Sequence, residues 1–244
     1  MTATGLAPAA HFGQGSREPY ARALQAGTGT LTLRPESEIS AAPPVHFQVR
    51  DWCAEASLLE RSLLRSLQGP LLDVGCGPGR LLAASGAMGL TALGIDTSAE
   101  AVRWALNRGA RALEQSIFAP VPQTGTWQSV VVLDGNIGIG GSVTALLRRC
   151  RQLIAPTGTL LVEVDPDQDL DTAYSAVLED DTGNLSEPFR WARTGTAGLA
   201  ERARRSGWTV ASVQHLQGRI FCRLSPAAEA GRVAKPFGSG TDAS

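Results

Sequence analysis

Several residue types are scarce in this chain of 244 residues, and each scarcity excludes a class of protein. Cys53, Cys76, Cys150 and Cys222 are the only cysteines, and they are scattered without a CxxC pair. The three histidines are equally dispersed. We therefore expect neither a disulfide scaffold nor a bound metal, because both need clustered ligands. Aromatic residues make up only 5% of the chain.

Charge of one sign and long apolar runs are also missing. The 22 basic and 23 acidic residues give a formal net charge of −1, so no broad positive field exists to attract nucleic acid, and we expect no nucleic-acid partner. No run approaches the roughly 18 apolar residues that span a bilayer. The start, MTATGLAPAAHFG, lacks the basic and apolar regions of a secretory leader. We expect a cytoplasmic protein that does not contact a membrane.

Glycine, by contrast, is abundant: 27 residues, about ten more than average composition predicts. In the central part of the chain, short apolar runs alternate with helix-patterned segments, which is typical of a parallel sheet covered on both faces. The predicted strands are 70–75, 91–96, 110–115, 129–135 and 159–165, the predicted helices between them are 79–88, 98–108 and 142–154, and a helix over 195–206 precedes strands at 208–216 and 219–224. The fold class is therefore α/β, with a doubly wound sheet.

The flanking regions differ in pattern from this core. We expect residues 1–50 to form a partly flexible N-terminal cap, in which the alternating pattern of 30–36 predicts a short strand. Apolar residues at helical spacing predict an amphipathic helix over 51–67. A polar insert is expected near 166–194. Residues 225–244 are rich in Pro, Gly, Ala and Ser without periodicity, which predicts a disordered tail. The main domain would then cover 51–224.

The most informative segment is LLDVGCGPGR, residues 71–80, where the first core strand turns into a helix. A dinucleotide fingerprint, G-x-G-x-x-G, fails because Arg80 stands where the third glycine belongs. A phosphate-binding P-loop fails because the segment has no lysine. What remains is D-x-G-x-G-x-G: an acidic residue ending a strand, followed by glycines at alternate positions.

This pattern resembles the first motif of the class I S-adenosylmethionine-dependent methyltransferases. The resemblance implies a Rossmann-like sheet of seven strands, mostly parallel with an antiparallel last strand. It also implies that S-adenosyl-L-methionine is the cosubstrate and S-adenosyl-L-homocysteine the product. By this resemblance Asp73 helps to hold the methionine ammonium, while Gly75, Cys76, Gly77 and Gly79 form the loop beneath the methionine, where a Cβ would occupy the volume of the ligand.

Two further segments fit the same family. Asp96 ends the run TALGID about 20 residues after the glycine loop, where an acidic residue binds ribose hydroxyls, with Thr97 beside it. Asp96 could instead only cap the following helix. After the third strand, Ser116 stands at the position of an adenine-reading acid and Ile117 at that of a residue packing on the ring. Phe118, the next residue, could belong either to this site or to the hydrophobic core.

The end of the fourth strand, VLDGNIGIGG (132–141) after two further valines, carries an acid and four glycines. In the resembled family this strand end lies beside the transferred methyl group. The predicted catalytic residues are Asp134, which also counts as a cosubstrate residue, Glu163 and His46. Asp165 and His11 are further candidates for a base, whereas we expect His215 to be uninvolved. The glycines of residues 138–141 could instead only form a tight turn between the strand and the next helix, with Ser142 as the N-cap of that helix.

The acceptor site is expected in the cap and the insert. Trp52, Trp191, Arg193 and, after the fourth strand, Asn136 are its candidate residues, with aromatic side chains lining an apolar pocket and the arginine binding a carboxylate. The same aromatic residues could merely anchor the cap. The predicted reaction is methyl transfer to oxygen or nitrogen of a small molecule, in bacterial secondary metabolism. The alternatives are a binding protein of the same fold without turnover, or another reaction at the donor site.

Overall fold

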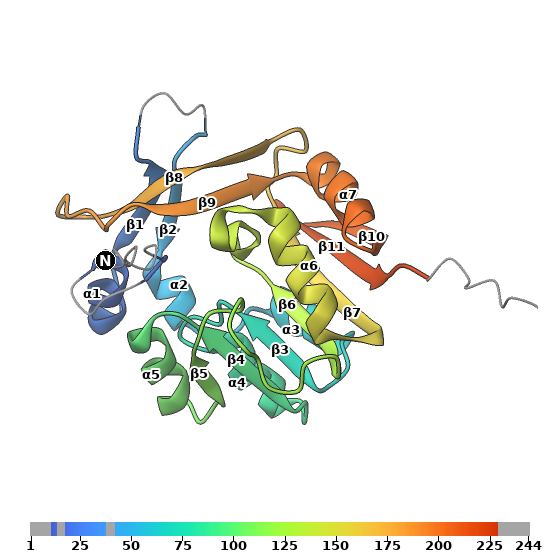
Figure 1. Cartoon of the computed structure of the whole chain (residues 1–244). Coiled ribbons are helices and arrows are strands. Elements are labelled where there is room, and N and C mark those ends of the chain that lie inside the picture. Colours follow the sequence, from blue (N-terminus) through green and yellow to red (C-terminus); the bar gives the residue numbers. More distant parts are fainter. Residues whose placement is uncertain (1–10, 14–17, 38–41, 229–244) are drawn as a thin grey trace, which may run out of the picture.

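A seven-stranded sheet forms the centre of the molecule in the computed structural model, which describes residues 11–13, 18–37 and 42–228 (Figure 1). Its strand order is β10-β11-β7-β6-β3-β4-β5, and the five core strands are parallel. β11 runs antiparallel to both β7 and β10. The predicted doubly wound, mostly parallel sheet of seven strands is therefore confirmed.

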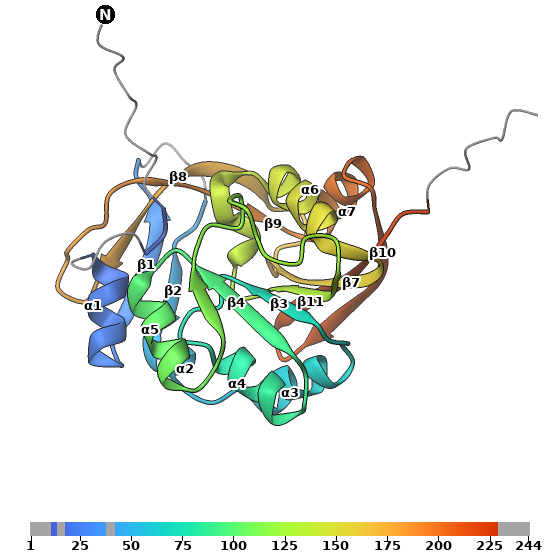
Figure 2. The same ribbon diagram turned by 60° about the horizontal axis from the view of Figure 1, so that its bottom comes forward.

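The elements of this sheet follow the predicted order along the chain. They are β3 (Leu71–Val74), α4 (Arg80–Ala87), β4 (Ala92–Asp96), α5 (Ala99–Asn107), β5 (Ala112–Glu114), β6 (Trp127–Val132), the 3-10 helix η1 (Asn136–Gly141), α6 (Val143–Leu153), β7 (Ile154–Val164), α7 (Thr196–Arg205), β10 (Trp208–Leu216) and β11 (Arg219–Pro226). Side chains alternate across β6, as expected of a strand covered on both faces: Val130 and Val132 pack with α6, whereas Val131 packs with α3 (Leu58–Arg65) and α4. Figure 2 shows α6 on one face of the sheet and α3 and α4 on the other.

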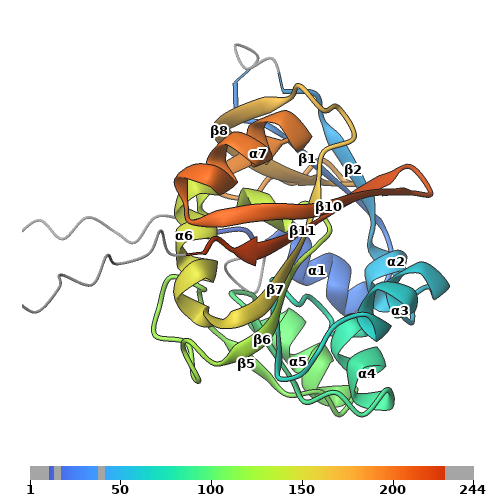
Figure 3. The same cartoon turned by 90° about the vertical axis from the view of Figure 1, so that its right-hand side faces the viewer.

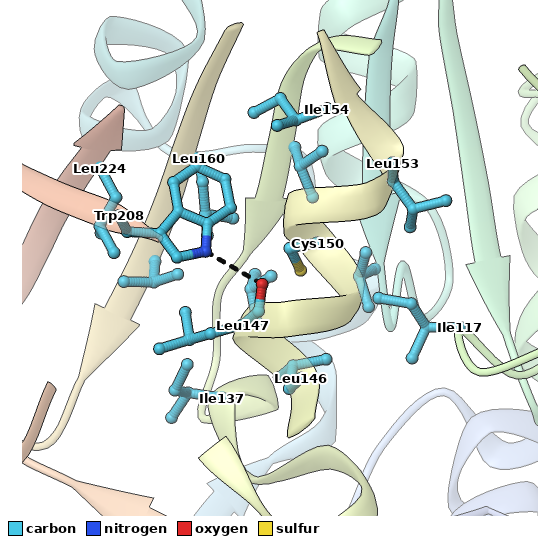
Figure 4. Close-up of a cluster of buried hydrophobic side chains, with 14 of the residues drawn as sticks. Ile117, Ile137, Leu146, Leu147, Cys150, Leu153, Ile154, Leu160, Trp208 and Leu224 are labelled. Atoms are coloured by element: carbon cyan, nitrogen blue, oxygen red, sulfur yellow. Dashed lines mark hydrogen bonds between the residues drawn. The ribbon is translucent and has the colours of Figure 1, made fainter. Parts of the chain in front are cut away.

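The apolar face of α6 anchors this helix to the sheet (Figure 4). Leu146, Leu147, Cys150 and Leu153 are all at most 1% exposed. Full burial of each leucine contributes about 2 kcal/mol to folding. The indole Nε1 of Trp208 donates a hydrogen bond of 3.0 Å to the carbonyl oxygen of Leu147, so the start of β10 is fixed to the same helix.

A second, antiparallel sheet joins the two predicted appendages. Its order is β2-β1-β8-β9, with β1 (Thr30–Pro35) and β2 (Val45–Gln48) from the N-terminal region and β8 (Asp171–Asp180) and β9 (Phe189–Thr194) from the insert (Figures 1 and 3). β1 pairs with β8 from Leu31↔Asp180 to Pro35↔Ala176. The cap and the insert therefore form one structural unit, with α1 (Pro19–Ala26) packed against it.

Two sequence-based boundaries are wrong. The helix expected over 51–67 is two helices, α2 (Val49–Cys53) and α3. The chain breaks there because Ser57 and Glu60 form a reciprocal capping box, in which each side chain accepts the backbone N–H of the other residue. Ser225 and Pro226, expected to belong to a disordered tail, are part of β11; residues 229–244 of the expected tail lie outside the described residues. In the described part of the chain, no helix is long and apolar enough to cross a membrane.

Candidate active site

Two neighbouring cavities lie at the carboxyl ends of the central strands, which is where open α/β sheets bind ligands. The first cavity, whose lining includes Gly75, Asp96, Ile117 and Asn136, is roofed by residues from the second sheet and the N-terminal region. The second cavity is larger, about 920 Å³, and lies between the two sheets. Trp191 of β9 lines both cavities, so the two spaces share a wall.

The glycine loop between β3 and α4 has a backbone that favours glycine. Gly75, Gly77 and Gly79 have φ values of +69°, +52° and +82°, in the left-handed region. A Cβ on Gly75 would come within 2.5 Å of the Asn136 side chain, and one on Gly79 within 2.7 Å of Ala105. The close neighbours of these two glycines are thus protein atoms, and the predicted reason, that a Cβ would fill ligand volume, does not describe them.

Asp73 lies under this loop with an unsatisfied oxygen. Its side chain is 2% exposed, and its Oδ2 has no hydrogen-bond partner. Burial raises the pKa of Asp73 to about 7, because the carboxylate has lost its water and the opposing charge of Arg80 only partly compensates. A buried carboxyl oxygen without a partner fits a cationic group such as the methionine ammonium of S-adenosylmethionine.

Asp96 fastens the end of β4 to the glycine loop. Its Oδ2 accepts the backbone N–H of Gly77 at 2.9 Å, and its Oδ1 accepts that of Ser98 at 2.8 Å. Ser98, not Asp96, is the N-cap of α5. Burial raises the pKa of Asp96. Each carboxylate oxygen keeps a second lone pair, so this geometry leaves Asp96 able to accept ribose hydroxyls in the first cavity.

Of the other predicted cosubstrate residues, Thr97, Ser116 and Ile117 line the same cavity, whereas Cys76 and Asp73 do not. The Thr97 hydroxyl donates to the carbonyl oxygen of Phe12 at 3.0 Å and so holds the N-terminal segment over the site. Cys76 is buried, and burial raises the pKa of its thiol. The Ser116 hydroxyl accepts the backbone N–H of Phe118 at 3.2 Å. Ile117 is 3% exposed, while Phe118, which is 44% exposed, is a cavity residue and not a core residue.

The wall of the second cavity carries a network of five charged side chains: Glu60, Arg80, Asp134, Glu163 and Arg219. Arg80 lies 2.6 Å from Glu60 and 2.8 Å from Asp134. Arg219 lies 2.6 Å from Glu163, 3.1 Å from Asp134 and 3.3 Å from Glu60. Glu163 also accepts the backbone N–H of Asp134 at 2.7 Å. We call these five residues the arginine–carboxylate network.

The network shifts the pKa values of its buried members. Burial alone would raise the pKa of Glu60, but the hydrogen bonds and charge of Arg80 outweigh burial and lower it to about 2. The pKa of Arg80 is raised by the two carboxylates around it. Glu60 and both arginines therefore stay charged at neutral pH. Asp134 and Glu163 are held by arginines, so accepting a proton from an acceptor would weaken these ion pairs.

Sequence reasoning missed two members of the network. Glu60 lies on α3, where an amphipathic pattern suggests a solvent-exposed charge, yet it is 4% exposed. Arg219 begins the last strand, far from the motifs. The S-x-x-E spacing of Ser57 and Glu60 is a readable capping signal that locates the start of α3. Nothing in the sequence indicates that Glu60 and Arg219 meet.

The remaining candidates divide between the two cavities. His46 and Trp52 line the second cavity, and the His46 Nδ1 lies 3.0 Å from the Thr32 hydroxyl. Arg193 also lines the second cavity, but it is held by Asp165 at 2.5 Å and by the Pro43 carbonyl oxygen.

Of the last three candidate residues, two line the first cavity and one lines neither cavity. Asn136 lines the first cavity, where its Nδ2 donates to the Gly75 carbonyl oxygen at 2.9 Å and braces the glycine loop. His11 lines the first cavity as well. His215 lies exposed on the edge strand β10 and lines neither cavity. Among the described residues, no group of three or more His, Cys, Asp and Glu side chains is arranged to hold a metal ion.

The fold and the strand-end cavities agree with the family comparison. A family model described as a methyltransferase domain matches residues 46–222, which is most of the chain. The chain belongs to the class I S-adenosylmethionine-dependent methyltransferase family. The match begins in β2 and ends in β11, so it contains the seven-stranded sheet up to the first half of β11, together with the insert. The comparison with curated proteins gives no match.

Solved structures share this methyltransferase fold. A SAM-dependent methyltransferase from Bacteroides fragilis, in complex with S-adenosyl-L-homocysteine, has a TM-score of 0.71 at 20% identity, over 92% of this chain and 98% of that chain. The CcbJ methyltransferase from Streptomyces caelestis gives 0.56 at 12% identity, over 72% and 92%. The Burkholderia thailandensis 1,6-didemethyltoxoflavin-N1-methyltransferase gives 0.54 at 16%, over 73% and 81%. At these identities the similarity concerns the fold alone.

Proposed function

We propose that this methyltransferase moves a methyl group from S-adenosyl-L-methionine to an oxygen or nitrogen atom of a small molecule. The observation that carries the proposal is the pair of cavities sharing Trp191 at the strand ends: one lies beside Asp96 and the glycine loop, and the other is a separate space of about 920 Å³. Similar structures act on 1,6-didemethyltoxoflavin and on a glycopeptide, which supports an acceptor of modest size.

In this proposal the chain's residues chiefly bind and orient. Asp73 would hold the methionine ammonium, Asp96 the ribose hydroxyls, and Ile117 would pack on the adenine. When bound, S-adenosylmethionine supplies a methyl group already activated on sulfur. The protein then has to align the acceptor with this methyl group and exclude water, which Phe12 and Trp191 favour by covering the site. Cytoplasmic location and a role in bacterial secondary metabolism stay predictions.

The test combines binding with labelled transfer. Calorimetry should show that S-adenosylhomocysteine binds to the purified protein. With methyl-labelled S-adenosylmethionine and a bacterial lysate, the label should appear in small molecules that pass a size filter. Label found only in protein or nucleic acid would contradict the proposal. Binding without any labelled product would favour the non-catalytic alternative.

A further inference from the structure

Negative charge is in excess on the wall of the second cavity. Six acidic side chains line the cavity, against three arginines. The acidic residues are Asp51, Glu55, Glu60, Asp134, Glu163 and Asp165. Asp51 and Glu55 lie at the exposed rim, with side chains 71% and 88% exposed and arginines beside them, so water and counterions screen them. The inner residues therefore decide the charge that a bound molecule meets.

The inner carboxylates are not fully balanced. Asp165 pairs with Arg193, which leaves the arginine–carboxylate network with three carboxylates and two arginines. Asp134 is the most exposed of its three carboxylates, with 22% of its side chain accessible against 14% for Glu163 and 4% for Glu60. Among the carboxylates of the network, Asp134 is thus the one that a bound molecule reaches most easily, although Arg80 and Arg219 both contact it; it lies two residues after the end of β6.

The arginines of this cavity, in the part of the chain that the structure describes, are all engaged. Arg80 and Arg219 hold the network carboxylates, and Arg193 holds Asp165 and a backbone carbonyl oxygen. An acceptor carboxylate or phosphate would have to displace one of these pairs. The predicted use of Arg193 for an acceptor carboxylate is therefore opposed by its ion pair.

Aromatic rings face the same space. Phe47 and Trp52 line the cavity with their ring centroids 5.0 Å apart, and Trp191 forms the wall toward the first cavity. Aromatic faces attract organic cations, and this attraction grows where water is excluded. Carboxylate and aromatic side chains together are therefore suited to an organic cation with an apolar body.

We propose that the acceptor is a cationic amine with an apolar or aromatic body, its nitrogen held near Asp134 and its body packed against Phe47 and Trp52. This inference rests on the proposed function and narrows it to nitrogen. The ammonium first loses a proton to water. The nitrogen lone pair then forms the bond to the methyl carbon while the carbon–sulfur bond breaks and leaves its electron pair on sulfur. The product is the methylated ammonium, with S-adenosylhomocysteine and one released proton.

The test uses three probes that share one skeleton: phenethylamine, 2-phenylethanol and phenylacetate. Each probe is titrated into the full chain saturated with S-adenosylhomocysteine, and its binding is followed by ligand-observed NMR. S-adenosylhomocysteine is used because it has no sulfonium charge that would repel a cationic probe. Asp134→Asn removes the unbalanced charge without changing side-chain size, and Asp51→Asn makes the same chemical change at the exposed rim. The S-adenosylhomocysteine affinity of every variant is measured first so that saturation is ensured.

We expect phenethylamine to bind at least about tenfold more tightly than either other probe, and Asp134→Asn to remove most of this preference while Asp51→Asn keeps it. Equal or tighter binding of the alcohol or the carboxylate would overturn the inference, as would no binding of the amine or an unchanged preference in Asp134→Asn. Failure of the wild-type protein to bind S-adenosylhomocysteine would count against the proposed function itself, whereas binding without an amine preference overturns only this inference.

Discussion

Replacing Arg80 by methionine should strongly destabilise the protein. The Arg80 and Glu60 side chains are 8% and 4% exposed and 2.6 Å apart, so the substitution leaves a carboxylate buried with only the more distant Arg219 as a cation. Breaking a buried ion pair from one side costs about 3–5 kcal/mol. The lowered pKa of Glu60, about 2, agrees in direction with this cost, because the effect of burial is outweighed by the hydrogen bonds and charge of Arg80, which favour the ionised carboxylate. We expect a loss near the lower end of this range.

Urea unfolding followed by tryptophan fluorescence measures this loss. Glu60→Gln added to Arg80→Met should restore part of the stability, because the uncompensated charge is then gone. Arg103→Met is the matched control: its ion pair with Glu100 is exposed on the arginine side, and its unfolding midpoint should barely move.

The pH dependence of the loss has a definite sign. The folded-state pKa of Glu60 is lower than its unfolded value, so its stabilising contribution is complete above pH 4.5 and disappears as the pH falls toward 2. The difference between wild type and Arg80→Met should shrink over that window. A loss below about 1 kcal/mol at pH 7, or no rescue by Glu60→Gln, would refute the reasoning.

Three further predictions concern the loop and the shared wall. Burial raises the pKa of Asp73 to about 7, so the ammonium of S-adenosylhomocysteine should ionise this carboxyl on binding. At pH 6 binding should therefore release up to one proton, and the affinity should rise as the pH approaches 7. Calorimetry in two buffers of different ionisation enthalpy should show this release for the wild type and no release for Asp73→Asn. Asp96→Ala should weaken S-adenosylhomocysteine binding and Gly77→Val abolish it, and unchanged affinity in both would contradict the site assignment. Gly138→Ala would place a Cβ 2.3 Å from a backbone oxygen of β9 and should lower the unfolding midpoint, whereas Gly86→Ala, with nothing within 4 Å, should keep or raise it.

Local patterns were enough to predict the central sheet and the position of the glycine loop. The strand at 92–96 ends in Asp96, and Asp73 lies one residue before the end of the strand at 71–74. Both acids stand where the apolar runs end, because buried parallel strands need continuous apolar residues. The structure brings both acids to the glycine loop: Asp96 by a hydrogen bond and Asp73 by burial beneath it.

Pairing over long distances in the chain could not be predicted in this way. The pairing of Leu31 with Asp180 joins segments that look like separate appendages, since the alternation of a strand does not name its partner. Burial of Glu60 and Arg219 was equally hidden, because the sequence shows a charge but not its environment. The break at Ala54 was readable in retrospect from the capping box at Ser57.

The composite second sheet limits how the acceptor preference of this enzyme can change. The second cavity has walls from β2 and from β9, whose strands belong to one hydrogen-bonded sheet although more than a hundred residues separate them in the chain. An exchange of either segment alone, as in a chimera with another methyltransferase, would break strand pairing as well as alter the cavity. Libraries aimed at new acceptors should therefore vary the cavity-facing side chains of residues 45–52 and 189–194 together and leave the strand register unchanged.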